Sequence, residues 1–157
     1  MNIETIEKDI YASFATIAST IGYSEIHGRI IAALMVSGKK LSLQELAKKT
    51  GYSISTLSLS LDLLEFFGMI KKVKNVGDRK LYIELQGNLL EGLKRAFIVK
   101  IQKSISDSLN KFNEYKKILK KSKEKNKKNV INVLNILENE IKKLDKYINV
   151  LSKLKFA

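Results

Sequence analysis

The sequence predicts a mainly α-helical fold with one small β-hairpin, and three observations support this prediction. Apolar residues recur every three or four positions along most of the 157-residue chain, which is the spacing of amphipathic helices. Proline is absent, so the residue that most often breaks long helices interrupts none of them. One short segment, residues 81–85, instead alternates apolar and polar side chains, as a half-buried strand does.

Two helices are expected before the first tight turn. The apolar residues of segment 3–21 fall on one helical face, and Gly22 ends that segment. Ser24 can cap the next segment, 25–37, whose dense apolar content indicates a central core helix. Within it, Gly28 lacks a side chain and is expected to let another helix approach closely.

A pair of short helices joined by a tight turn follows. The stretch Ser42-Leu-Gln-Glu matches the capping box, in which the Ser hydroxyl accepts from an unpaired amide while the Glu side chain reaches back to the cap. It predicts a helix over 43–50, which Gly51 closes in a left-handed conformation. After one further residue, Ser53 can cap a second helix that runs to about Phe67.

A β-hairpin with a basic loop is predicted next. The Gly77-Asp78 turn lets the segment 69–76 double back on strand 81–85. Helix, tight turn, helix and hairpin, in that order within residues 40–85, are typical of a winged helix-turn-helix. In that fold the second helix enters the DNA major groove, and the hairpin, or wing, lies along the backbone or minor groove.

Long helices are predicted for the rest of the chain. Apolar spacing indicates one from 90 to about 121, and a seven-residue repeat over 130–151 indicates another. Segment 120–128 has no apolar residue and is either a solvated helix turn or a loop. The apolar residues of this repeat can pack on this chain's own core or form a subunit interface. We expect them to do both. The residues predicted for a dimer interface are Leu137, Ile141, Leu144, Ile148 and Leu151.

The fold class expected is therefore mainly α with a small β-hairpin: a winged helix-turn-helix plus long C-terminal dimerisation helices. The domains expected are 1–87, the winged helix-turn-helix with its N-terminal helices, and 88–157, the dimerisation region. The N-terminal stretch is polar, and no uninterrupted apolar run reaches the length of a membrane helix. A cytoplasmic protein without a membrane partner is expected.

Composition narrows the function classes. The chain has 29 Lys and Arg against 16 Asp and Glu, a formal charge of +13, which predicts a polyanionic partner such as nucleic acid. A plainer explanation of this positive charge is that an AT-rich genome encodes many lysines, which lie on the protein surface. Cysteine is absent and His27 is the single histidine, so thiolate zinc sites and Ser-His-Asp triads are not expected. We expect no catalytic residues, no metal site and no cofactor, and hence no enzyme.

Residues that contact double-stranded DNA are expected on the second helix and the wing. Residues 54–67 contain no Lys or Arg but include Asp62 and Glu65, so arginine cannot read guanine from this helix. A helical projection turns Leu57, Leu61 and Leu64 inward, and we expect modest, AT-leaning specificity from the hydroxyls outside. The predicted helix contacts are Ser53, Ser55, Thr56, Ser58 and Leu59; the predicted wing contacts are Lys72, Lys74, Arg79 and Lys80.

Four local stretches carry a resemblance to a known family: His27-Gly28-Arg29-Ile30, Leu41–Ala47, Leu64–Ile70 and Gly77-Asp78-Arg79-Lys80. Over Met1–Leu85 the chain resembles the GbsR-type branch of the MarR-like transcriptional regulators. The resemblance implies a homodimeric winged-helix regulator whose terminal helices form the dimer body and which binds a pseudo-palindromic operator. Some regulators of this kind respond to a small effector. Members usually carry basic residues near both ends of the recognition helix, and this chain does not.

Two other functions remain open at this stage. A winged-helix module can instead bind a protein partner, here through Leu59, Leu63 and Phe66, because fold alone does not fix function. A basic coiled-coil protein can coat nucleic acid or anionic lipid without sequence preference, here through residues 111–128. The sequence predicts neither the operator, nor the regulated gene, nor the identity of an effector.

Overall fold

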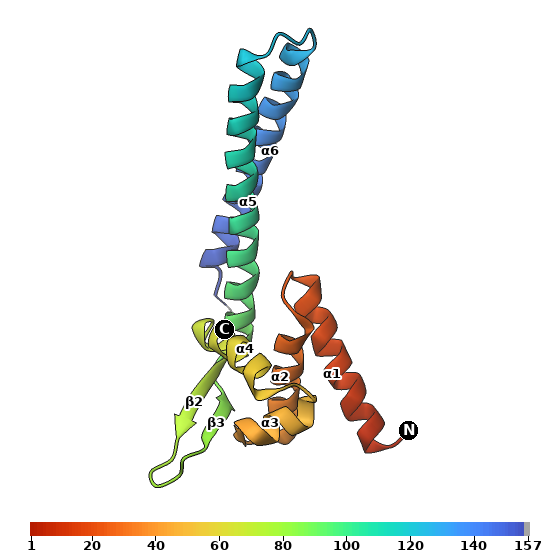
Figure 1. Cartoon of the computed structure of the whole chain (residues 1–157), viewed down its shortest axis with the longest axis vertical. Coiled ribbons are helices and arrows are strands. Elements are labelled where there is room, and N and C mark those ends of the chain that lie inside the picture. The colour runs from red at the N-terminus through yellow and green to blue at the C-terminus, as the bar shows by residue number, and fades with distance from the viewer. Residues whose placement is uncertain (156–157) are drawn as a thin grey trace. The chain divides into compact units, whose positions relative to one another are not determined.

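The computed structural model describes residues 1–155, which form two compact units divided between residues 93 and 94 (Figure 1). The first unit contains α1 (Ile3–Thr20), α2 (Glu25–Ser37), β1 (Leu41–Ser42), α3 (Leu43–Thr50), α4 (Ile54–Phe66), β2 (Ile70–Lys74) and β3 (Leu81–Leu85). Helix α5 (Leu89–Lys121) begins in the first unit and continues into the second, where α6 (Lys127–Lys153) follows it. The predicted class, mainly helical with a small antiparallel sheet, is confirmed.

The predicted helix boundaries are set by local hydrogen bonds. The capping box of α3 is complete: the Glu45 amide donates to Ser42 Oγ at 3.1 Å, and the Ser42 amide donates to Glu45 Oε2 at 2.8 Å. Gly51 closes the helix with φ of 76°, a left-handed conformation. Ser53 caps α4 as predicted, whereas Ser24 stands at the N-cap of α2 without a side-chain hydrogen bond.

The sheet has one strand more than the predicted hairpin. Its order is β1-β3-β2, with both pairs antiparallel. Strand β1 places Leu41 opposite Ile83, and the hairpin places Ile70 opposite Leu85. Strand β1 has only two residues, which is too short for an alternating pattern to be recognised in the sequence.

The core of the first unit surrounds α2. A Cβ added to Gly28 would lie 2.1 Å from the Phe14 carbonyl oxygen, so α1 and α2 touch where the sequence predicted a close approach. Each fully buried Leu or Ile contributes roughly 1.5–3 kcal/mol, and these side chains come from α2, α3, α4 and all three strands. The largest of them are Ile30, Leu34, Leu41, Leu46, Leu57, Leu61, Ile70 and Ile83.

The second unit is a hairpin of two long helices (Figure 1). Ile98 and Ile105 of α5 form a buried cluster with Ile148 of α6. Residues 122–126 lie between the helices, so the lysine-rich segment 120–128 comprises the end of α5, a loop and the first residues of α6. Glu138 accepts from the ammonium groups of Lys116 and Lys142, which lowers the pKa of its carboxyl to about 2.

None of the helices within residues 1–155 combines the length and the apolar content that a membrane span requires.

Candidate nucleic-acid interface

Helix α4 presents a neutral, hydroxyl-rich outer face. Its inward residues, Leu57, Leu61 and Leu64, are buried as the helical projection predicted. The predicted contact residues on the other side are all exposed, and Leu59 is 78% exposed. The core therefore fixes the rotation of α4 about its axis, and this rotation leaves the predicted contact residues accessible from outside.

The hydroxyls at the start of α4 form a local cluster. Ser53 Oγ accepts from the Thr56 amide at 3.2 Å and lies 2.7 Å from Thr56 Oγ1. Ser55 Oγ is 3.2 Å from the same Ser53 oxygen, and the Ser58 hydroxyl donates to the Ile54 carbonyl at 2.9 Å. Hydroxyls both donate and accept, so this end of the helix can meet base edges and phosphates of several kinds.

The two carboxylates of α4 face a lysine from the wing, which comprises β2, loop 75–80 and β3. Lys72 Nζ forms an ion pair with the Asp62 carboxylate and lies 3.9 Å from Glu65 Oε1. The Lys72 backbone amide donates to Glu65 Oε2 at 3.3 Å. Lys72 is thus held against α4, unlike the other cations predicted for the wing.

Asp78 organises the loop of the wing. Its amide donates to the Asn75 carbonyl at 3.1 Å, which closes the turn. Its carboxylate accepts from the Lys80 amide and from the Tyr82 hydroxyl, each at 2.9 Å. These two donors lower the pKa of the Asp78 carboxyl, and donation to Asp78 raises the pKa of the Tyr82 hydroxyl. The loop therefore holds its shape through hydrogen bonds that leave its basic side chains unused.

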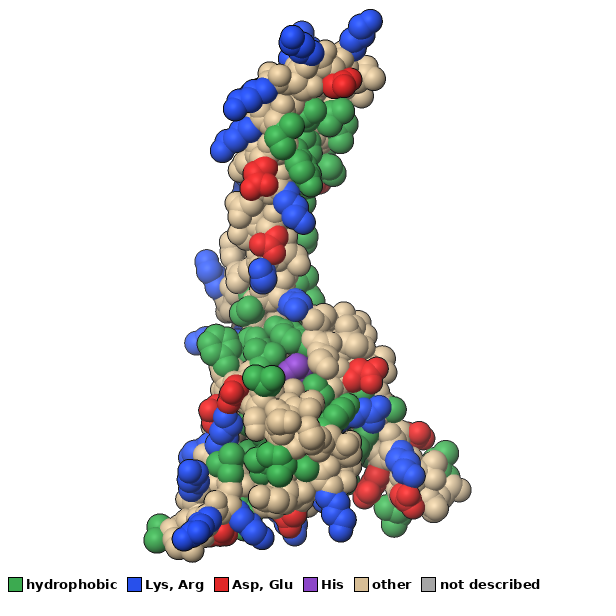
Figure 2. Space-filling view, in the orientation of Figure 1, with side chains coloured by type: hydrophobic (Ala, Val, Ile, Leu, Met, Phe, Trp, Pro, Cys, Tyr) green, Lys and Arg blue, Asp and Glu red, His purple; other side chains and the backbone are tan. Residues whose placement is uncertain are grey.

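Three predicted wing cations, Lys74, Arg79 and Lys80, are open to solvent. Within residues 1–155 none of their side chains has an ion-pair or hydrogen-bond partner. Asp78 bonds to Lys80 and Tyr82 and forms no ion pair with Arg79. Figure 2 shows Lys and Arg side chains along the hairpin and on the neighbouring surface of the first unit.

Lys40 is a member of this basic surface that the sequence did not single out. Its Nζ donates to Asn75 Oδ1 at 3.1 Å and lies 5.2 Å from the centre of the Tyr82 ring. Lys40 and Asn75 are 35 residues apart. The pairing of β1 with β3 brings them together, and no local spacing signals that contact. Lys40 braces the loop and adds positive charge beside it.

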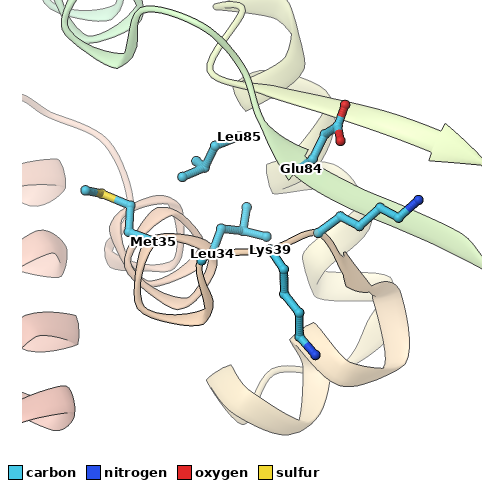
Figure 3. A pocket seen from close by; sticks show the side chains of 7 residues that line it. Leu34, Met35, Lys39, Glu84 and Leu85 are labelled. Atoms are coloured by element: carbon cyan, nitrogen blue, oxygen red, sulfur yellow. The ribbon is translucent and has the colours of Figure 1, made fainter.

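A shallow pocket of about 430 Å³ adjoins Lys40. Leu34 and Met35 from α2 and Leu85 from the end of β3 face the same space (Figure 3). Lys39, Lys40 and Glu84 supply the charges around this apolar surface. No group of three or more His, Asp or Glu that could hold a metal occurs in the described part of the chain.

The residues predicted for the dimer interface fall into two groups. Ile148 is buried against α5 and Ile141 packs beside it, so both contact their own chain. Leu137, Leu144 and Leu151 are 41–44% exposed. Further exposed apolar side chains lie beside these three leucines. Figure 2 shows apolar side chains gathered on the pair of long helices, toward the end where the loop joins them. We call the exposed set the α6 stripe: Val130, Val133, Ile136, Leu137, Leu144, Tyr147, Val150 and Leu151.

Comparison with known proteins gives the fold a second line of support. No family model matches the chain, and no curated protein matches it either. A solved structure described as a transcriptional regulator matches with a TM-score of 0.53 at 18% identity, over 94% of this chain and 99% of its own.

Two other structures overlap less well. NadR in complex with 4-hydroxyphenylacetate has a TM-score of 0.44 at 19% identity, over 98% of this chain and 93% of its own. The ligand-free organohalide-sensing regulator RdhR has a TM-score of 0.43 at 19% identity, over 99% of this chain and 87% of its own. At such identities the likeness concerns the fold alone. The chain has the winged-helix fold with long C-terminal helices.

Proposed function

We propose that this protein is a DNA-binding transcriptional regulator that acts as a homodimer on a pseudo-palindromic operator. One observation carries the proposal most directly. Lys74, Arg79 and Lys80 are exposed and unpaired in the described structure, on a wing whose loop is fixed by Asp78. Cations held in place without internal partners are what a phosphate backbone requires.

The geometry supports different roles for the wing and α4. The wing supplies charge, so it provides most of the affinity, and the Arg79 side chain suits a narrow, electronegative minor groove. The exposed hydroxyls of α4 and the Leu59 side chain contact base edges, where Leu59 meets a thymine methyl. Because α4 has no arginine, discrimination is modest and favours A·T pairs.

The α6 stripe supports a dimer in which a second copy of this chain covers it. Its members recur with the seven-residue period of a coiled coil over the 27 residues of α6. Exposed apolar side chains in that number are unusual on a monomer surface. A twofold pair would present two wings and two recognition helices to inverted half-sites about one helical turn apart.

Finer assignments rest on the sequence. On the four local stretches that resemble GbsR-type regulators, we assign the protein to that branch, and we infer that it acts in the cytoplasm. We keep the predicted domains, 1–87 for DNA binding and 88–157 for dimerisation, although the compact units of the structure divide between residues 93 and 94. The structural likeness to regulators agrees with this assignment at the level of the fold.

A duplex-binding titration across salt concentrations tests the DNA-binding role. Counterion release predicts that log K falls linearly with log salt, with a slope of roughly −0.9 per phosphate contact. Selection from random duplexes should then return inverted half-sites. A protein that retains no duplex at low salt is not a DNA-binding regulator.

Sedimentation of a charged variant tests the dimer. Leu144→Lys places an ammonium group in the α6 stripe and should shift the protein to monomers, since an unpaired charge is costly in an apolar interface. Asn139→Lys adds the same charge to an exposed position outside the stripe and should leave the dimer intact. A wild-type monomer at micromolar concentration would contradict the homodimer.

Exposure of Leu59 and Phe66, at 78% and 75%, favours a second candidate function, a module that binds a protein partner through α4. The two functions differ in the salt titration, because a protein-binding module shows no steep salt-dependent duplex binding. Non-specific coating through residues 111–128 is distinguished by deleting residues 111–157 and fusing a foreign dimeriser. Duplex binding should survive in that fusion if the wing carries it.

A further inference from the structure

The position of Lys72 differs from that of every other predicted wing contact. Ile70 is buried, and side chains two residues apart lie on the same face of a strand, so Ile70, Lys72 and Lys74 share one face of β2. Lys72 lies beside α4 on this face, whereas Lys74, two residues nearer the loop, is exposed. Lys72 pairs across the hairpin with Ile83, which is fully buried. The Lys72 side chain therefore leaves the sheet on the core-facing side and is only 26% exposed.

The partners of Lys72 are the two acidic residues of α4. Its ammonium pairs with Asp62 and lies 3.9 Å from Glu65, and its backbone amide donates to Glu65 Oε2 at 3.3 Å. Because β2 is an edge strand, this amide would otherwise face solvent. Glu65 thus bonds both the side chain and the backbone of one residue.

We propose that Lys72 is a positioning residue that neutralises the carboxylates of α4 and ties the wing to this helix, and that it is not itself a phosphate contact. This inference rests on the proposed function, because the carboxylates matter only if α4 approaches a polyanion. Without Lys72, Asp62 and Glu65 would repel the phosphates flanking the groove. With it, an acidic recognition helix approaches DNA at little electrostatic cost.

The test compares two lysines of the same strand. Lys72→Met keeps the aliphatic stem and removes the charge; Lys74→Met does the same at an exposed, unpaired position. If Lys72 acts through the carboxylates, K72M weakens duplex binding about five- to tenfold, the effect of roughly 1 kcal/mol of repulsion, while the salt slope stays that of the wild type. K74M should reduce the slope by about two, since a dimer loses two contacts.

A rescue experiment distinguishes neutralisation of the α4 carboxylates by Lys72 from direct contact of Lys72 with phosphate. Adding D62N and E65Q to K72M should restore affinity to within about twofold of the wild type, because the repelling charges are gone. D62N and E65Q alone should tighten binding several-fold, since Lys72 is then free to reach phosphate. A K72M slope reduced by about two, with no rescue by the amides, would overturn the proposal. If K72M fails to fold, unchanged affinity of the D62N/E65Q protein would overturn it instead.

A measurement without DNA keeps the inference distinct from the proposed function. In the free protein, the Lys72 amide should exchange with solvent several-fold faster in E65A than in the wild type, while the amides of β3 stay protected. Equal exchange in both proteins would mean that Glu65 does not hold β2. Failure of the wild type to bind any duplex would refute the regulator and leave this exchange result unaffected.

Discussion

The wing and α4 belong to the same unit but use their side chains in opposite ways. The wing satisfies its hydrogen bonds internally through Asp78, and the side chains of Lys74, Arg79 and Lys80 have no hydrogen-bond or ion-pair partner within residues 1–155. Helix α4 carries no cation, and the wing's own Lys72 pairs with its two carboxylates. In the proposed function, this contrast assigns the charge that binds phosphates to the wing and the contacts with base edges to α4.

The largest effect is expected from truncating a buried leucine of α4. Leu57 is fully buried, so Leu57→Ala should lower the free energy of unfolding by about 2–5 kcal/mol. Leu59→Ala, on the exposed face, should change it by no more than about 0.5 kcal/mol. Urea unfolding of both variants measures this difference. Equal losses would mean that the rotation of α4 is not the one described.

The next largest effect is expected from the wing. Arg79→Ala should weaken duplex binding about tenfold and reduce the salt slope by about two per dimer, because each subunit loses one phosphate contact. Lys8→Ala removes the same charge from an exposed pair with Glu4 on α1 and should leave the slope unchanged. Fluorescence anisotropy at several salt concentrations gives both values. An unchanged slope for Arg79→Ala would remove Arg79 from the interface.

A smaller effect, on base preference, is expected at the exposed face of α4. Leu59→Ala should reduce the preference for A·T over G·C at one position of each half-site by about two- to fivefold, since only an apolar contact with the thymine methyl is lost. Its salt slope should equal that of the wild type. Competition between duplexes that differ at single base pairs measures the preference. Loss of overall affinity without loss of preference would count against base contact by Leu59.

The smallest effect concerns pH and the loop of the wing. The folded pKa of Asp78 lies below its ordinary value of 3.8, because the Lys80 amide and the Tyr82 hydroxyl donate to the carboxylate. Its stabilising contribution is therefore complete above the unfolded pKa and is lost as pH falls through the lowered folded value. NMR of the Lys80 amide should show a midpoint below 3.8. A midpoint at or above that value would mean that these bonds are absent in solution.

Asp78→Asn provides the matched variant for the same network. An amide oxygen accepts less strongly than a carboxylate, so the Tyr82 hydroxyl, whose pKa Asp78 raises, should titrate closer to its ordinary value of 10.0. Tyr82 resonances followed above pH 9 would report the change. The same midpoint in both proteins would show that Tyr82 does not donate to Asp78.

Elements with local signals could be predicted from the sequence, and contacts that depend on register could not. The capping box at Ser42, the cap at Ser53 and the turn at Gly77 each involve residues within a few positions, and all three lie where they were predicted. Strand β1 and the contact of Lys40 with Asn75 depend on pairing across the sheet.

Contacts between elements also decide the roles of Lys72 and of the α6 repeat, which the sequence could not distinguish. Lys72 and Lys74 lie on the same face of β2, and only the contact of Lys72 with α4 distinguishes them, so the sequence grouped the two lysines together. The seven-residue repeat of α6 was recognisable, but its division into a buried edge at Ile141 and Ile148 and an exposed stripe depends on where α5 lies. The DNA and dimer contacts themselves stay predictions.

The most direct test of these roles of the wing and α4 compares two triple variants in one salt titration. Lys74→Ala/Arg79→Ala/Lys80→Ala removes the wing charges, and Ser55→Ala/Thr56→Ala/Ser58→Ala removes the hydroxyls of α4. We predict that the wing variant lowers the salt slope by about five per dimer, since each of its six contacts is worth about 0.9, while the α4 variant keeps the wild-type slope to within about one. A wing variant that keeps the wild-type slope would contradict the account.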